Sequence, residues 1–290
     1  MFAPFEIWLR GGNYSIRLTE VEPLVPELEV INQIAKCPFK GIDNPLVTLN
    51  YIQFDKEIIT YGVGTTQFRT HYVLNKTDAV SNGRAIALKL GVLPLTALSL
   101  SVTSDGYVVF GERSSRTVSS GSFTLLPGGY MHPSHRHGSE LSLEAVIEEE
   151  LGEELGLPKE NISSCCSTGL VFSNTINRGF VSAHITTVRA DSSLVKSNYE
   201  CCHDSETSGI LFVKSNDTDI IDFVIPRLRT FSNHALGVLL CSGRLLYGDD
   251  FYKRLIRGIQ SELGSVIILF DDTFATPGKT VKSTIELYSH

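Results

Sequence analysis

Apolar residues at four-residue intervals predict one helix with unusual clarity. Leu143, Ile147, Leu151 and Leu155 form a stripe along one side of a helix that turns by about 100° per residue. Such a stripe is typical of a surface helix that packs one face against a core.

Both ends of this helix carry capping signals. Ser142 is a good N-cap, because its hydroxyl can accept a hydrogen bond from the first turn. Gly156 and Pro158 are residues that end helices. The sequence therefore predicts a helix between Ser142 and Gly156.

Strand-like segments flank this helix on both sides. Two runs rich in valine, leucine and threonine surround Asp105-Gly106 within residues 93–110, which predicts a hairpin. A further strand at 122–126 leads into Pro127-Gly128-Gly129. Strands are also expected at 169–172, 180–188, 209–213 and 266–270, and helices at 235–246 and 250–263.

The first 92 residues read as a β-rich segment before this α/β domain of residues 93–290. We expect strands at 5–10 and 14–21 around a glycine turn, β structure at 46–60 and 68–74, and a short helix at 83–90. A scaffold is the first interpretation of segment 1–92. A lobe that covers the site and a dimerisation element remain alternatives.

Composition narrows the class of protein. The net charge of −7 argues against nucleic acid or an anionic membrane as the main partner. No secretion signal or apolar run of about 18 residues is recognisable, so we expect a cytoplasmic protein. The six cysteines lack C-x-x-C spacing, and we expect free thiols.

The predicted helix is strongly acidic, with six carboxylates between Glu144 and Glu154. Like charges four residues apart destabilise a helix, so a compensating cation is expected. Glu150, Glu153 and Glu154 fall within one arc, where their oxygens suit Mg²⁺ or Mn²⁺. Glu148 and Glu149 are expected on a solvated face.

The segment EELGEELGL from Glu149 to Leu157 resembles the end of the Nudix box, R-E-U-x-E-E-x-G-U with U apolar. Gly129 matches the glycine that opens the box. The resemblance implies an α/β/α sandwich with a mixed sheet. It also implies that Glu150, Glu153, Glu154 and the Gly129 carbonyl hold Mg²⁺ or Mn²⁺, with Glu153 and Glu154 serving catalysis.

Two features depart from the box. Glu149 stands where the box has arginine, so the charge that normally steadies the first ligand is missing. Ten residues separate Gly129 from Glu140, where the box has five before its first glutamate. His132, His135, Arg136 and His137 lie in this enlarged loop.

Candidate substrate contacts lie outside the box. Arg113 and Arg116 carry planar guanidinium groups that suit phosphate oxygens, although an ordinary exposed loop is the alternative. Asn177 and Arg178 lie in a polar loop that could approach the substrate. An acidic residue outside the box often acts as general base in proteins with the Nudix box, and this resemblance makes Glu206 the candidate general base.

The resemblance implies hydrolysis of a nucleoside diphosphate linked to another group. Scattered residues, among them RSSRTV from Arg113, more weakly resemble the UDP-glucose pyrophosphatase branch. A UDP-sugar is thus the first choice of substrate and ADP-ribose the next. A non-catalytic nucleotide-binding or protein-interaction module is the main alternative, and a homodimer is conceivable. A Nudix-fold isomerase is a third option, but no cysteine is convincingly placed for it.

Overall fold

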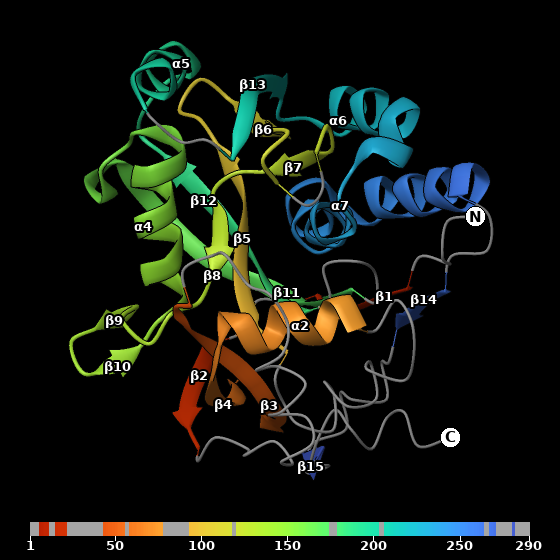
Figure 1. Cartoon of the computed structure of the whole chain (residues 1–290). Helices are drawn as coiled ribbons and strands as arrows, with labels where there is room; N and C mark the ends of the chain where they lie inside the picture. Colours follow the sequence, from red (N-terminus) through yellow and green to blue (C-terminus); the bar gives the residue numbers. More distant parts are fainter. Residues whose placement is uncertain are drawn as a thin grey trace.

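The fold is built from two β-sheets and helices that cover both faces of the larger one (Figure 1). The computed structural model describes residues 6–11, 15–21, 43–55, 58–77, 93–117, 120–173, 179–202, 206–263, 267–270 and 280–281. This is the mixed α/β architecture of the predicted α/β/α sandwich, with a β-rich N-terminal region.

The larger sheet has nine strands within these ranges, with the path β13-β6-β5-β12-β11-β1-β14 and with β7 on β6 and β8 on β5. The β5–β12 and β1–β14 pairs are parallel and the others antiparallel, so the sheet is mixed as expected. Its strands are β1 (Glu6–Gly11), β5 (Leu95–Val102), β6 (Tyr107–Arg113), β7 (Phe123–Leu125), β8 (Gly128–Tyr130), β11 (Ile162–Ser173), β12 (Gly179–Val188), β13 (Thr207–Lys214) and β14 (Ile267–Phe270).

The predicted hairpin at 93–110 opens soon after its turn. Gly106 has φ +82°, which fits a tight turn, but Val102 and Val108 are the only pair in the β5–β6 register. Strand β5 pairs with β12 on its outer edge and with β8 on the edge that faces β6. Strand β6 likewise pairs with β13 on its outer edge and with β7 on the edge that faces β5. The glycine turn before the acidic helix therefore lies within the sheet.

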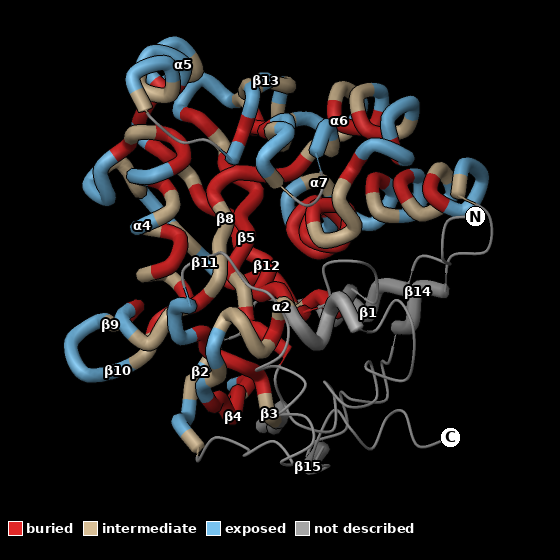
Figure 2. The backbone as a smooth tube through the Cα atoms, in the orientation of Figure 1, coloured by how far each residue is buried: buried red, intermediate tan, exposed pale blue. Residues whose placement is uncertain are grey.

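Helices form a layer on each face of this sheet (Figures 1 and 2). On one face, Leu151 and Leu155 pack in a core with Val109 and Val188, and on the other Phe110 packs with the C-terminal helix. The first layer holds α4 (Leu143–Leu155) and α5 (Ser192–Cys201). The second holds α6 (Asp217–Val224), η2 (Ile225–Thr230) and α7 (Asn233–Leu263), while η1 (Lys159–Asn161) precedes β11.

The capping signals of the acidic helix are confirmed. The Ser142 hydroxyl accepts a hydrogen bond from the Ala145 N–H at 3.3 Å, and Gly156 follows the helix with φ +65°. The four leucine and isoleucine side chains of the stripe are buried. The two predicted C-terminal helices are also present, as the parts of α7 on either side of a kink at Gly248.

The smaller sheet packs beneath the start of the acidic helix. It contains β15 (Thr280–Val281), β3 (Pro45–Asp55), β4 (Ile58–Gln67) and β2 (Ser15–Glu20) in that order, beside the short pair β9 (Arg136–His137) and β10 (Glu140–Leu141). Val47 and Tyr61 share a core with Leu143 and Ile147 of α4. Met131 joins the two sheets, because its N–H donates to Leu95 and its carbonyl accepts from Val47. The strands predicted at 5–10 and 14–21 correspond to β1 and β2, which lie in different sheets.

One N-terminal prediction was wrong. Residues 68–74 were expected to be β, but Phe68–Thr77 form helix α2. Its first N–H groups are satisfied from outside the segment, by the Asn44 carbonyl at 2.9 Å and the Asp43 carboxylate at 2.8 Å. These capping partners are distant in sequence, so the local pattern did not reveal them. The helix expected at 83–90 lies outside the described residues.

No helix within the described ranges is both long and apolar enough to cross a membrane.

Candidate functional site

The glycine turn and the acidic helix meet in close contact. A Cβ atom on residue 129 would overlap the carboxylate of Glu150, so a larger residue at this position would have to displace that side chain. One residue earlier, the Gly128 N–H donates a hydrogen bond of 2.8 Å to the Glu154 carboxylate. Glu154 is almost fully buried, with 4% of its surface exposed. The turn and helix α4 thus form one continuous wall.

This wall borders a cavity of about 580 Å³. The residues that line it come from both halves of the Nudix-like pattern and from the strands beside it. They include all of the predicted site residues that the structure describes: Gly129, Glu150, Glu153, Glu154, Arg113, Arg116 and Glu206. Asn177 and Arg178 lie outside the described residues.

Arg113, a candidate phosphate ligand, forms an ion pair with Glu206, the candidate general base. The Arg113 guanidinium donates to the Glu206 carboxylate at 3.0 Å. The pairing follows from the sheet, where Arg113 ends β6 and Glu206 precedes β13, and the Ser114 N–H donates to the Glu206 carbonyl. Arginine and carboxylate are therefore adjacent at the cavity wall, although they are 93 residues apart.

The donor set suits a hard divalent cation. Three carboxylates and a backbone carbonyl at Gly129 are oxygen donors of the kind that Mg²⁺ and Mn²⁺ prefer. The Glu150 carboxylate lies directly against Gly129. Within the described ranges, however, no three histidine, cysteine, aspartate or glutamate side chains form a group arranged to hold a metal ion. Metal ligation by these residues stays a prediction.

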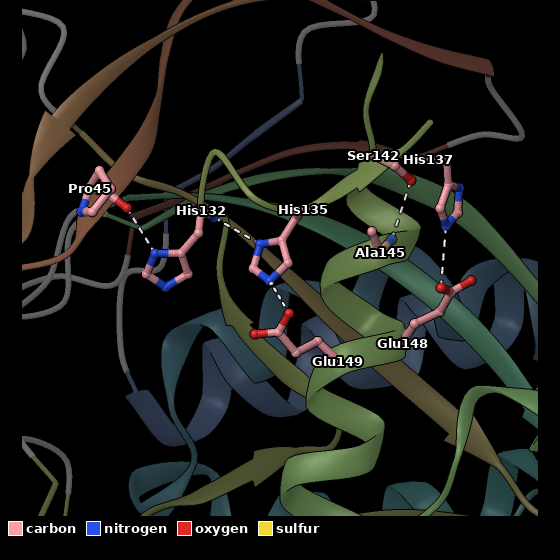
Figure 3. Close-up of polar contacts among 8 residues, drawn as sticks. All are labelled: Pro45, His132, His135, His137, Ser142, Ala145, Glu148 and Glu149. Atoms are coloured by element: carbon pink, nitrogen blue, oxygen red, sulfur yellow. Dashed lines mark hydrogen bonds and ion pairs between the residues drawn. The ribbon is translucent and has the colours of Figure 1, made fainter. Parts of the chain in front are cut away.

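The enlarged loop is fastened to helix α4 by two histidines (Figure 3). His135 Nε2 lies 3.2 Å from the Glu149 carboxylate, an ion-pair contact without hydrogen-bond geometry. His137 Nε2 lies 3.3 Å from the Glu148 carboxylate. Glu149 is exposed as expected and Glu148 is half-buried, and each also contacts a histidine of the loop. Glu149, which replaces the box arginine, thus contacts a histidine from the inserted residues.

His135 is the buried histidine of this loop. Its side chain is 2% exposed, and its Nδ1 accepts a hydrogen bond from the His132 N–H at 2.8 Å. Burial lowers the pKa of His135, while the nearby Glu149 carboxylate opposes that shift. The imidazole is therefore held in place by the backbone on one side and by α4 on the other.

Several cavity residues carried no usable sequence signal. His234, near the start of α7, lines the cavity beside Ser232, and no residue in the described part of the chain hydrogen-bonds its Nε2. Burial lowers the pKa of His234 to about 4, so the imidazole is neutral near pH 7. Phe68 and Tyr130 also line the cavity. Each comes from an element whose place beside the acidic helix depends on tertiary packing.

Comparison with known proteins gives structural likeness only. No protein-family model matches the chain, and no curated protein matches it. A similar solved structure is DR0079 from Deinococcus radiodurans, 15% identical over 51% of this chain and 82% of that one, with a TM-score of 0.38. A MutT protein from Methanosarcina mazei is 18% identical, over 57% and 93%, with a TM-score of 0.31.

A third similar structure is the Nudix domain of Shewanella oneidensis NrtR, solved with ADP ribose. It is 14% identical over 59% of this chain and 97% of that domain, with a TM-score of 0.36. The chain therefore resembles solved Nudix proteins. At these identities and scores the likeness identifies no substrate.

Proposed function

We propose that the cavity hydrolyses the diphosphate linkage of a nucleoside diphosphate joined to another group. One observation carries this proposal: the Glu150 carboxylate fills the space of a side chain at Gly129, on the wall of a cavity that also contains Arg113 and Arg116. Carboxylates and arginines lining one cavity suit a ligand that brings both a cation and phosphate groups. A solvated acidic helix would not need the glycine turn against it.

Mg²⁺ or Mn²⁺ would be held by Glu150, Glu153, Glu154 and the Gly129 carbonyl. Such a cation, when bound, supplies Lewis acidity toward phosphate oxygens and makes water more acidic. The other parts of the reaction belong to the chain. Arg113 and Arg116 would orient the diphosphate, which removes part of the entropic cost of the reaction.

The Arg113–Glu206 ion pair suggests how the base would become available. Substrate phosphate would compete with the Glu206 carboxylate for the guanidinium of Arg113. Glu206 would then accept the proton of the water that attacks phosphorus. The bridging P–O bond breaks, and two phosphate-containing products result. Asn177 and Arg178 remain proposed contacts of the linked group.

A UDP-sugar is the first candidate substrate and an ADP-ribose-like conjugate the second.

The described cysteines, Cys165, Cys166, Cys201, Cys202 and Cys241, are free thiols. This supports the proposal of a cytoplasmic enzyme.

The test is turnover on a panel of UDP-glucose, ADP-ribose, NADH, coenzyme A and a nucleoside triphosphate. Phosphate release is coupled through a phosphatase, and each reaction is run with Mg²⁺, Mn²⁺ or EDTA. Hydrolysis that is lost in EDTA is the expected result. Hydrolysis that is insensitive to EDTA would contradict the proposed role of the acidic helix.

A second candidate function is a non-catalytic module that binds a nucleotide. Two observations favour it: Glu149 in place of the box arginine, and the lack of a metal-ready group of side chains among the described residues. Such a module would show a rise in melting temperature with a nucleotide but no product with any metal. Product release on the panel would exclude it.

A further inference from the structure

We propose that Phe68, Tyr130 and His132 form the subsite for the aromatic base of the substrate's nucleotide. The inference rests on the proposed function and adds to it the part of the cavity that recognises the base. It also assigns a role to the N-terminal segment, which would supply Phe68 to the site.

Phe68 is held at the cavity by the backbone around it. It follows the last residue of β4, and its N–H donates a 2.9 Å hydrogen bond to the carbonyl of Asn44. Its ring lies 6.0 Å from the ring of Tyr130, at an interplanar angle of 73°. This edge-on contact is a favourable aromatic geometry. Phe68 is only half-buried and lines the cavity, so part of its surface faces the cavity space.

Tyr130 connects this aromatic cluster to the glycine turn. It is the last residue of β8 and pairs with Thr96 of β5. His71, one turn along α2, packs against it at 5.9 Å and 65°. His71 is 4% exposed, and burial lowers its pKa to about 4. Two rings from α2 therefore fix Tyr130 without placing a positive charge there near pH 7.

His132 adds a directed polar group to the same end of the cavity. Its Nδ1 lies 2.8 Å from the carbonyl of Pro45, next to the Asn44 carbonyl that binds Phe68 (Figure 3). A carbonyl only accepts hydrogen bonds, so Nδ1 carries the proton. When the ring is neutral, Nε2 is an acceptor, which suits the amino or imino N–H of a base.

The groups that line the cavity fit a nucleotide. Gly129 faces the acidic helix, Tyr130 packs against α2, and His132 lies beside Pro45. Arg113 and Arg116 line the same cavity as Phe68 and Tyr130. One nucleotide would therefore place its diphosphate at the arginines and the acidic helix and its base beside α2. Stacking on an aromatic side chain suits any base, because every base has a π face.

The experiment compares binding of ADP and of inorganic pyrophosphate to variants of position 68, by calorimetry with Mg²⁺. Phe68→Ala should weaken ADP binding by roughly 5- to 100-fold, the range for loss of one stacked base. Pyrophosphate binding should change less than about twofold, since it carries no base to stack. Phe68→Leu, which keeps apolar volume but lacks a ring, should behave like Phe68→Ala, whereas Phe68→Tyr should bind ADP like wild type.

A spectroscopic reading separates stacking from a structural effect. The sequence contains one tryptophan, Trp8, so the wild-type spectrum supplies the background for Phe68→Trp. ADP should quench the added fluorescence and pyrophosphate should not. Equal losses for ADP and pyrophosphate in Phe68→Ala, or no loss for either, would overturn the subsite. A wild-type protein that binds neither ADP nor pyrophosphate would overturn the proposed function as well, whereas a failure of the subsite alone leaves pyrophosphate binding by the wild-type protein intact.

Discussion

Glu150 and Gly129 are packed so closely that the carboxylate of one fills the space of a side chain on the other. Glu150 belongs to the acidic helix, and Gly129 belongs to a strand in the middle of the sheet. The contact fixes the helix against the turn at one point, where a backbone carbonyl and a carboxylate can face the same ligand.

Replacing Gly129 by alanine should displace Glu150 and reduce turnover strongly. We expect only a small loss of stability, because the atoms that the methyl group would displace are the flexible end of the Glu150 side chain. Urea unfolding and turnover measure the two effects. Gly152→Ala is the matched control on α4, because the nearest atom to its added Cβ would be 3.8 Å away. Alanine at this helical position should raise the free energy of unfolding by about 1 kcal/mol. Wild-type turnover in Gly129→Ala would contradict the importance of the contact.

Changing Glu153 or Glu154 to glutamine should abolish turnover with little change in melting temperature. At position 154 the glutamine carbonyl can still accept the Gly128 N–H, so the wall should persist. We expect turnover to fall at least about 100-fold, since the variant loses a charged oxygen donor to the cation. Titration with Mn²⁺ should show weaker binding in both variants.

Glu148→Gln is the control for this pair of variants. Glu148 lies on the same helix but pairs with His137 instead of lining the cavity. Its turnover should remain near wild type. If both cavity variants matched wild type instead, the ligand assignment would be wrong.

Glu206→Gln should distinguish a base from a mere partner of Arg113. If Glu206 accepts the proton of water, kcat should fall by about 10²–10⁴-fold while KM changes little. If it only holds the arginine, the main effect should be on KM. Arg113→Ala is the companion variant and should raise KM, because a phosphate contact is lost. Steady-state kinetics across pH provide the measurement.

The buried histidines predict loss of stability in acid. Burial lowers the pKa of His184 to about 4 from an ordinary 6.5, with Glu144 opposing the shift. The unfolded chain therefore binds more protons below pH 6.5, so stability is fully present above 6.5 and declines as pH falls toward 4. One such histidine accounts for about 3 kcal/mol over this range.

Urea unfolding of wild type and His184→Gln between about pH 7 and about pH 4 tests this linkage. The variant should show a shallower decline, because the titrating imidazole is gone. Parallel declines in wild type and His184→Gln would contradict the role of His184.

The local sequence pattern was sufficient to predict the acidic helix and the glycine turn before it. The stripe of Leu143, Ile147, Leu151 and Leu155 and the caps Ser142 and Gly156 are all encoded within fifteen residues, and each is in its expected place. The resemblance to the Nudix box then implies that the turn faces the helix. That half of the site could be predicted from sequence.

The other half depends on contacts that local pattern cannot contain. Arg113 meets Glu206 only because β6 pairs with β13, and Glu149 meets His135 only because the enlarged loop folds back on α4. Phe68 was assigned to a strand because its helix is capped by residues more than twenty positions earlier. His234 becomes a cavity residue only when α7 packs against the sheet.

Strand β1 is among the first residues described, yet it lies inside the larger sheet between β11 and β14. A fragment that begins after residue 92 would leave one edge of β11 open from Gly169 to Ser173, while the other edge stays paired with β12. An open strand edge is a template on which a second molecule can pair. Recombinant preparations of the α/β part alone should therefore self-associate through β11, and crystallisation or screening would require the N-terminal residues to be retained.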